Sequence, residues 1–220
     1  MARRRANVSG SAAKSPARAP KHKPGPKSGR TPARKPNPRA ASKKSSAGKS
    51  PLRKVPAGIN PSASGLEYLH WTHAMTTALL ADWPLEKLTY QSSPGDNHAL
   101  WTMGHLATTY SWFASLLDGH MTPLPENYNL LFGTGSKPVD DPMAYPPMGE
   151  VRHHFDATYA RFAELASQLK ASDALKPTVG NAHGFCKDRA DVFVKAAWHE
   201  GWHSGQLSTL RRALGLKTIM

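Results

Sequence analysis

The residues best suited to chemistry are two histidines near the end of the chain, His199 and His203. Four residues turn an α-helix through about 400 degrees, which leaves the two imidazoles about 40 degrees apart and one turn displaced. They lie on one predicted apolar stripe, which also contains Val192, Ala196 and Leu210. Two imidazoles on a core-facing stripe can bind one cation through their lone pairs. A pair of core histidines satisfied without a metal is the alternative interpretation.

A third ligand has to come from another helix. His105, in the stretch NHALWTMGHLATTY, is the best candidate because it lies between Trp101 and Trp112 with the small Gly104 beside it. His70 and His73 are alternatives that could replace or supplement it. Three protein ligands leave at least one coordination position open to water, a thiol or a substrate oxygen, as in catalytic sites. Imidazole nitrogens suit Zn, Ni, Fe or Cu, so the sequence predicts a divalent transition metal, such as Zn, Ni or Fe, without deciding which.

Four segments with apolar residues at spacings of three and four must position these histidines. They are predicted as helices over residues 64–83, 96–118, 148–170 and 188–215, with Asp96 or Asn97 as the cap of the second and Asp188 of the fourth. No segment between them predicts a strand. The sequence therefore predicts an all-α four-helix bundle over residues 61–218.

The positive charge of the chain belongs to its first residues. Residues 1–56 contain 17 Lys or Arg, nine Pro, no acid and no aromatic residue, so the other 164 residues hold 12 Lys or Arg against 15 acids. A basic nucleic-acid-binding globular domain is thereby excluded, because the part that can fold carries a net charge of −3. Residues 1–60 are predicted to be a disordered tail that binds nucleic acid without sequence specificity. A functionless leader, a start site assigned too early and a transit peptide are the alternatives.

Two compositional features bear on location. The single cysteine, Cys186, permits no intrachain disulfide, and no apolar run approaches the 18 residues that a membrane helix requires. We expect a soluble cytoplasmic protein without membrane contact. A reactive role for the Cys186 thiol is a minor alternative to an inert one.

The stretches WTMGHLATTY and HEGWHSGQLSTLRRALGL resemble two helices of the DinB/YfiT-like family. This resemblance spans roughly residues 64–216. It implies a four-helix bundle, often dimeric, that binds one divalent metal through three histidines, here His105, His199 and His203. It also implies a metal-dependent transferase or isomerase acting on a small molecule, with a low-molecular-weight thiol as co-substrate. No catalytic residue beyond the metal ligands is identified.

Two other functions fit parts of the sequence. His199, Glu200 and His203 satisfy the H-E-x-x-H pattern of zinc peptidases, in which the glutamate is the general base, but the 17 residues after His203 contain no further His, Asp or Glu ligand. Glu200 is instead expected at the surface or beside the metal ligands. A non-catalytic, metal-stabilised bundle that presents a DNA-binding tail is the other alternative. An opening from the metal position into a pocket beneath the 119–147 connection would favour catalysis or ligand binding.

The tail interpretation predicts salt-sensitive DNA binding. The full chain should bind duplex DNA with an affinity that falls as salt rises, by about 0.9 in log K per log salt for each phosphate neutralised. Deletion of residues 1–56 should abolish this binding in a fluorescence-anisotropy titration. Equal binding by the truncated chain would contradict the prediction.

Overall fold

The protein is described by a computed structural model over residues 60–219. All regular elements in this part of the chain are helices, without a strand among the described residues, as predicted. The four long helices are α1 (Ala63–Leu80), α2 (Ala99–Asp118), α4 (Met148–Gln168) and α6 (Arg189–Ala213), and the short ones are α3 (Tyr128–Phe132), α5 (Ala171–Ala174), η1 (Leu85–Lys87) and η2 (Pro142–Ala144). None of them is long and apolar enough to cross a membrane. The predicted disordered tail falls on residues 1–60, of which all but Asn60 lie outside the described residues.

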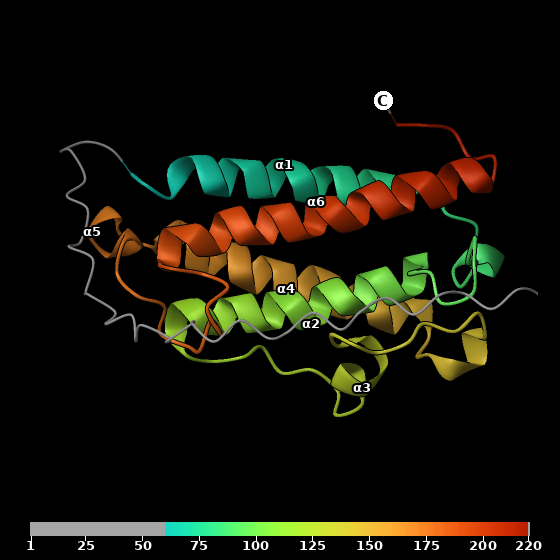
Figure 1. Cartoon of the computed structure of the whole chain (residues 1–220), viewed down its shortest axis with the longest axis horizontal. Helices are drawn as coiled ribbons and strands as arrows, with labels where there is room; N and C mark the ends of the chain where they lie inside the picture. Colours follow the sequence, from blue (N-terminus) through green and yellow to red (C-terminus); the bar gives the residue numbers. More distant parts are fainter. Residues whose placement is uncertain (1–59, 220) are drawn as a thin grey trace, which may run out of the picture. The chain divides into compact units, whose positions relative to one another are not determined.

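The long helices form a bundle with an up-down-down-up order. α1 lies along α6 and runs in the same direction, while α2 and α4 form the second parallel pair (Figure 1). Contacts at both ends fix the direction of α1 relative to α6: Gly65 approaches Phe193 at one end, and Leu79 meets Arg211 at the other. Because α2 and α4 are successive long helices that run in the same direction, a long connection must return the chain from the end of α2 to the end of the bundle where α2 began. Residues 119–147 make that connection, and it carries α3 and η2.

α2 is the central helix of the bundle. All but three of its 20 residues are buried, as expected for a helix that is apolar around most of its circumference. The predicted cap at Asp96 or Asn97 is wrong, because His98 caps the helix and its side chain accepts a hydrogen bond from the Trp101 amide. The Asp96 carboxylate instead accepts bonds from Ser92 and Ser93 in the preceding turn.

The core-facing side of α1 does not include His70, one of the alternative ligands. The buried residues are Gly65, Leu69, Thr72, Thr76, Leu79 and Leu80, whereas His70 is exposed and His73 is partly buried. The helix is closely packed at its start, where a Cβ on Gly65 would lie 3.1 Å from a Val194 methyl group. Because aromatic residues also occupy its outer side, the apolar period of α1 does not identify one face.

α6 begins and ends as its sequence predicts. The Asp188 carboxylate accepts a hydrogen bond from the Asp191 amide, and Gly215 adopts a positive φ of 70° just after the helix. Near its end the buried Arg211 donates bonds of 2.7 Å to the Leu79 carbonyl and 2.6 Å to the Asp82 carboxylate. These bonds hold the C-terminal ends of α6 and α1 together.

The cap of α2 makes stability depend on pH. Burial lowers the pKa of His98 from 6.5 to about 4, so the folded protein keeps this imidazole neutral while the unfolded chain takes up a proton below about pH 6.5. The free energy of unfolding should therefore fall as pH drops from 6.5 towards 4, by up to roughly 3 kcal/mol from this residue. His98→Asn, which keeps a capping side chain, should flatten that slope in urea titrations.

The matched control for this variant is the exposed His153 on α4. His153→Asn should leave the slope unchanged between pH 4 and 6.5. Identical slopes for the natural chain and His98→Asn would contradict the assignment.

Candidate metal centre

Three histidines from two helices converge at the middle of the bundle. His199 Nε2 lies 3.2 Å from His105 Nε2 and 3.3 Å from His203 Nε2. Each residue offers one nitrogen to a cluster in which all three donor atoms lie within 4.8 Å of one another. Donors about 2.0–2.1 Å from a tetrahedral ion are separated by about 3.3 Å, so the two distances from His199 Nε2 match the spacing that one ion would require. The structure thus brings together the three histidines singled out as metal ligands.

Hydrogen bonds on the far side of two rings fix which nitrogen carries the proton. His105 Nδ1 donates to the Phe132 carbonyl at 2.7 Å, and His203 Nδ1 donates to the Gln206 side-chain oxygen at 2.8 Å. Both Nε2 atoms are therefore unprotonated, with lone pairs directed at His199. One proton on His199 Nε2 can satisfy only one of them, whereas a single cation can satisfy all three nitrogens.

Burial keeps the three imidazoles neutral. Burial lowers the pKa of His199, and the neighbouring His203 and His105 lower it further, to about 3, because a proton on His199 would be repelled by a proton on either of them. Burial also lowers the pKa of His203 to about 4 and that of His105, with the bond to Phe132 opposing the shift in His105. Neutral imidazoles present the lone pairs that a metal needs at physiological pH.

A close approach of the crossover connection to α2 orients His105. A Cβ on Gly104 would lie 2.4 Å from ring carbons of Phe132, so only glycine allows Phe132 to lie where its carbonyl reaches His105. On its other side, His105 stacks on Trp101 with centroids 4.5 Å apart and planes at 9°. The Trp101 indole in turn donates to the Leu131 carbonyl and to Ser136 Oγ, both on the crossover. The sequence singled out Gly104 and Trp101 but gave no signal for the Phe132 carbonyl.

His203 is oriented by a pair of side-chain amides. The Gln206 oxygen that accepts from His203 also accepts from Asn97 Nδ2 at 3.2 Å. Asn97 lies just before α2, so this chain of bonds links the start of α2 to α6. A metal-binding histidine commonly has its second nitrogen fixed in this way.

A cavity of about 810 Å³ borders the cluster. His105 and His199 line it, and so do residues of the crossover, from Met121 to Ser136, and of the loop before α6, including Phe185. The three-histidine position therefore has access to a pocket beneath the 119–147 connection, the arrangement expected for catalysis or ligand binding. Sequence reasoning missed the contribution of Phe185 and of the exposed His183.

Glu200 lies away from the three histidines. It is fully buried, and its two oxygens bond His73 Nδ1 at 3.0 Å and the Tyr110 hydroxyl. The expectation that it lies at the surface or beside the metal ligands is therefore wrong. Because consecutive helix residues point about 100 degrees apart, Glu200 follows His199 in sequence but bonds His73 on α1 and Tyr110 on α2. The general base of an H-E-x-x-H peptidase is thus missing from the cluster.

The remaining candidates lie outside the cluster. His73 bonds Glu200, and His70 Nδ1 lies 2.6 Å from the Tyr159 hydroxyl, so neither replaces His105. Cys186 is buried, and desolvation together with the nearby Asp191 raises the pKa of its thiol to about 12. A thiol of that kind stays protonated and inert, which favours the inert interpretation.

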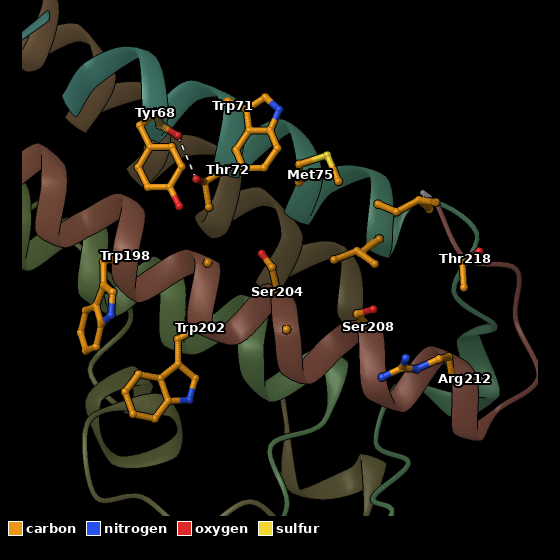
Figure 2. Close-up of a pocket in the computed structure, with 14 residues that line it drawn as sticks. Tyr68, Trp71, Thr72, Met75, Trp198, Trp202, Ser204, Ser208, Arg212 and Thr218 are labelled. Atoms are coloured by element: carbon orange, nitrogen blue, oxygen red, sulfur yellow. Dashed lines mark hydrogen bonds between the residues drawn. The ribbon is translucent and has the colours of Figure 1, made fainter. Parts of the chain in front are cut away.

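A second hollow of about 800 Å³ lies between α1 and α6 (Figure 2). Exposed aromatic side chains flank it, with Trp71 on α1 and Trp198 and Trp202 on α6 (Figure 2). Of the described residues, no His, Cys, Asp or Glu lines this groove. The similar volume therefore does not make it an alternative metal centre.

Fold and cluster together define a helical-bundle protein with three histidines that could hold a metal ion. A comparison with protein-family models matches residues 68–207 to the DinB superfamily. The match covers more than half of the chain, which therefore belongs to this superfamily. A search of curated proteins found no match.

The close approach at Gly104 gives a test of the cluster. Gly104→Ala should displace Phe132 and remove the acceptor for His105 Nδ1, which should weaken Zn²⁺ binding by about 10–100-fold in a competition titration with a chelator. Gly205→Ala, also in a long helix, is the control because a Cβ there meets nothing within 4 Å. Unchanged affinity in Gly104→Ala would show that the Phe132 contact does not orient the ligand.

Proposed function

We propose that this DinB-superfamily member is a divalent-metal-dependent enzyme that transfers or isomerises a small molecule, using a small thiol as co-substrate. One observation carries the proposal: donor nitrogens of His105, His199 and His203 lie within 4.8 Å of one another, and two of these residues line a cavity. Membership of the superfamily and the resemblance of its motifs to those of thiol-dependent members support the finer assignment.

The residues present fit a bound metal: some would be its ligands, and others hold those ligands in place. His105, His199 and His203 would hold it, and Phe132 and Gln206 keep two of the rings in the required tautomer. When bound, a divalent metal lowers the pKa of a coordinated thiol or water, or polarises a carbonyl. Nitrogen donors alone make Zn, Ni or Fe the candidates. Trp101, stacked on His105, excludes water from one side of that ring.

A non-catalytic, metal-stabilised bundle is the second candidate. Its three ligands would need a fourth group from the bundle to close the coordination shell. Glu200, the nearest carboxylate in sequence, is engaged with His73 and Tyr110. The cavity beside His105 and His199 supports access by a ligand, which favours the enzyme.

Removal of single ligands tests the metal site. Purified full-length chain should contain about one divalent metal per protomer by elemental analysis, and His105→Ala, His199→Ala and His203→Ala should each lose most of it. His70→Ala removes an exposed histidine outside the cluster and should retain the metal. Stoichiometric metal in all three ligand variants would contradict the assignment.

The reaction class requires a separate assay. Metal-loaded full chain should catalyse substitution of 1-chloro-2,4-dinitrobenzene by a small thiol, which forms a thioether and releases chloride and a proton. Chelation of the metal, or His199→Ala, should abolish the rate above background. Full metal occupancy with no rate for this or other electrophiles would favour the non-catalytic bundle.

A further inference from the structure

The cavity beside the cluster contains no full charge. Within the described part of the chain, its lining includes no Lys, Arg, Asp or Glu. Besides His105 and His199, the one titratable side chain is His183, which is exposed. Lys195 lies over the Phe185 ring at 5.2 Å but does not line the cavity. A charged group brought into this space would therefore lose hydration without gaining an oppositely charged Lys, Arg, Asp or Glu partner.

The two ends of the cavity differ in chemistry. Trp101, His105 and Trp112 follow one side of α2, so the histidine lies between the two tryptophans along about 16 Å of helix. Near Trp101 the wall is polar but uncharged: Ser136 accepts the indole bond at 2.9 Å, and Asn97 contributes an amide.

The other end is aromatic. Trp112 lies 4.9 Å from Phe113 and 6.0 Å from Phe185 between ring centroids, and Phe113 lies 6.4 Å from His199. Rings at these separations offer faces and edges on which a planar apolar group can pack. An aromatic group of a ligand could therefore pack against Trp112, Phe113 and Phe185, and Phe113 in turn lies beside the metal-ligand candidate His199.

Among the described residues around the cavity, the three-histidine position is where a bound metal would favour a negative charge. Neutral imidazoles leave the charge of a divalent ion uncompensated, so an anionic ligand atom is favoured there. A second negative charge elsewhere on the same molecule would find no cation in the cavity wall.

We propose that the cavity accepts a molecule with an aromatic or similarly apolar body and a single thiol or acidic hydroxyl that coordinates the metal. The rest of this molecule is uncharged. This proposal rests on the proposed function. Thiols that also carry carboxylates are disfavoured by the uncharged wall. The substrate class is thus narrower than small thiols in general.

A matched pair of thiols tests this. Full-length chain loaded with Co²⁺ is titrated with benzyl mercaptan and with 4-(mercaptomethyl)benzoate, which differ only in a carboxylate. Coordination is followed by the Co²⁺ visible spectrum. Benzyl mercaptan should bind at least about tenfold more tightly, because the benzoate must lose its hydration unpaired.

Each other outcome overturns a defined statement. Equal or tighter binding of the carboxylate compound, or no response to either thiol by cobalt-loaded protein, overturns the ligand class and leaves the metal site intact. Failure to take up Co²⁺ or Zn²⁺ at all overturns the proposed function, and the ligand class with it.

A charge added to the wall should invert the preference. Met121 lines the cavity, is half exposed, and follows the end of α2, where Ser111 Oγ holds the Thr122 carbonyl at 2.7 Å. Met121→Lys should tighten binding of 4-(mercaptomethyl)benzoate several-fold relative to benzyl mercaptan. Met143→Lys, at an exposed methionine outside this cavity, should leave the ratio unchanged. An unchanged ratio in Met121→Lys would show that the thiols bind elsewhere.

Discussion

The hydrogen bond from His105 Nδ1 to the Phe132 carbonyl links the helix packing, the path of the crossover and the chemical state of a candidate metal ligand. It requires a glycine at position 104 of α2, since any Cβ there would displace the Phe132 ring. It requires the crossover to return across α2 at that level. It also leaves the lone pair of Nε2 facing His199, because a carbonyl can only accept. Local backbone packing thereby sets the chemical state of a side chain at the cluster.

Much of the bundle could be predicted, for a physical reason. α2, α4 and α6 bury long apolar faces, and the period of those faces survives in the sequence. α1 shows the limit: with aromatic residues on its outer side as well, its pattern did not indicate which side packs against α6. The cap at His98 was missed because histidine is not one of the residue types that commonly cap a helix. The second hydrogen bond of its ring, to the Val139 carbonyl, joins residues that are distant in sequence.

The candidate site divides in the same way. His199 and His203 could be paired from spacing alone, since both lie on one helix. Joining them to His105 required only that two helices face each other. The cavity depends instead on where residues 121–136 and 182–185 return to the bundle, and nothing in their local sequence specifies that path. Glu200 was misplaced because adjacency to His199 in sequence means divergence on a helix.

The candidate metal ligands lie on helices, whereas much of the cavity wall lies on connections, and this affects which substitutions can alter the cavity. The donor nitrogens sit on α2 and α6, where a shifted residue would disturb the core, whereas much of the cavity wall comes from the crossover and the loop before α6. Exchanges in these connections away from Phe132 and the residues that bond Trp101 can alter the shape and polarity offered to a substrate while the Phe132 carbonyl keeps His105 oriented. Specificity and metal chemistry are therefore separable only in part, because the stretch of the crossover around Phe132 supports a ligand and also borders the cavity.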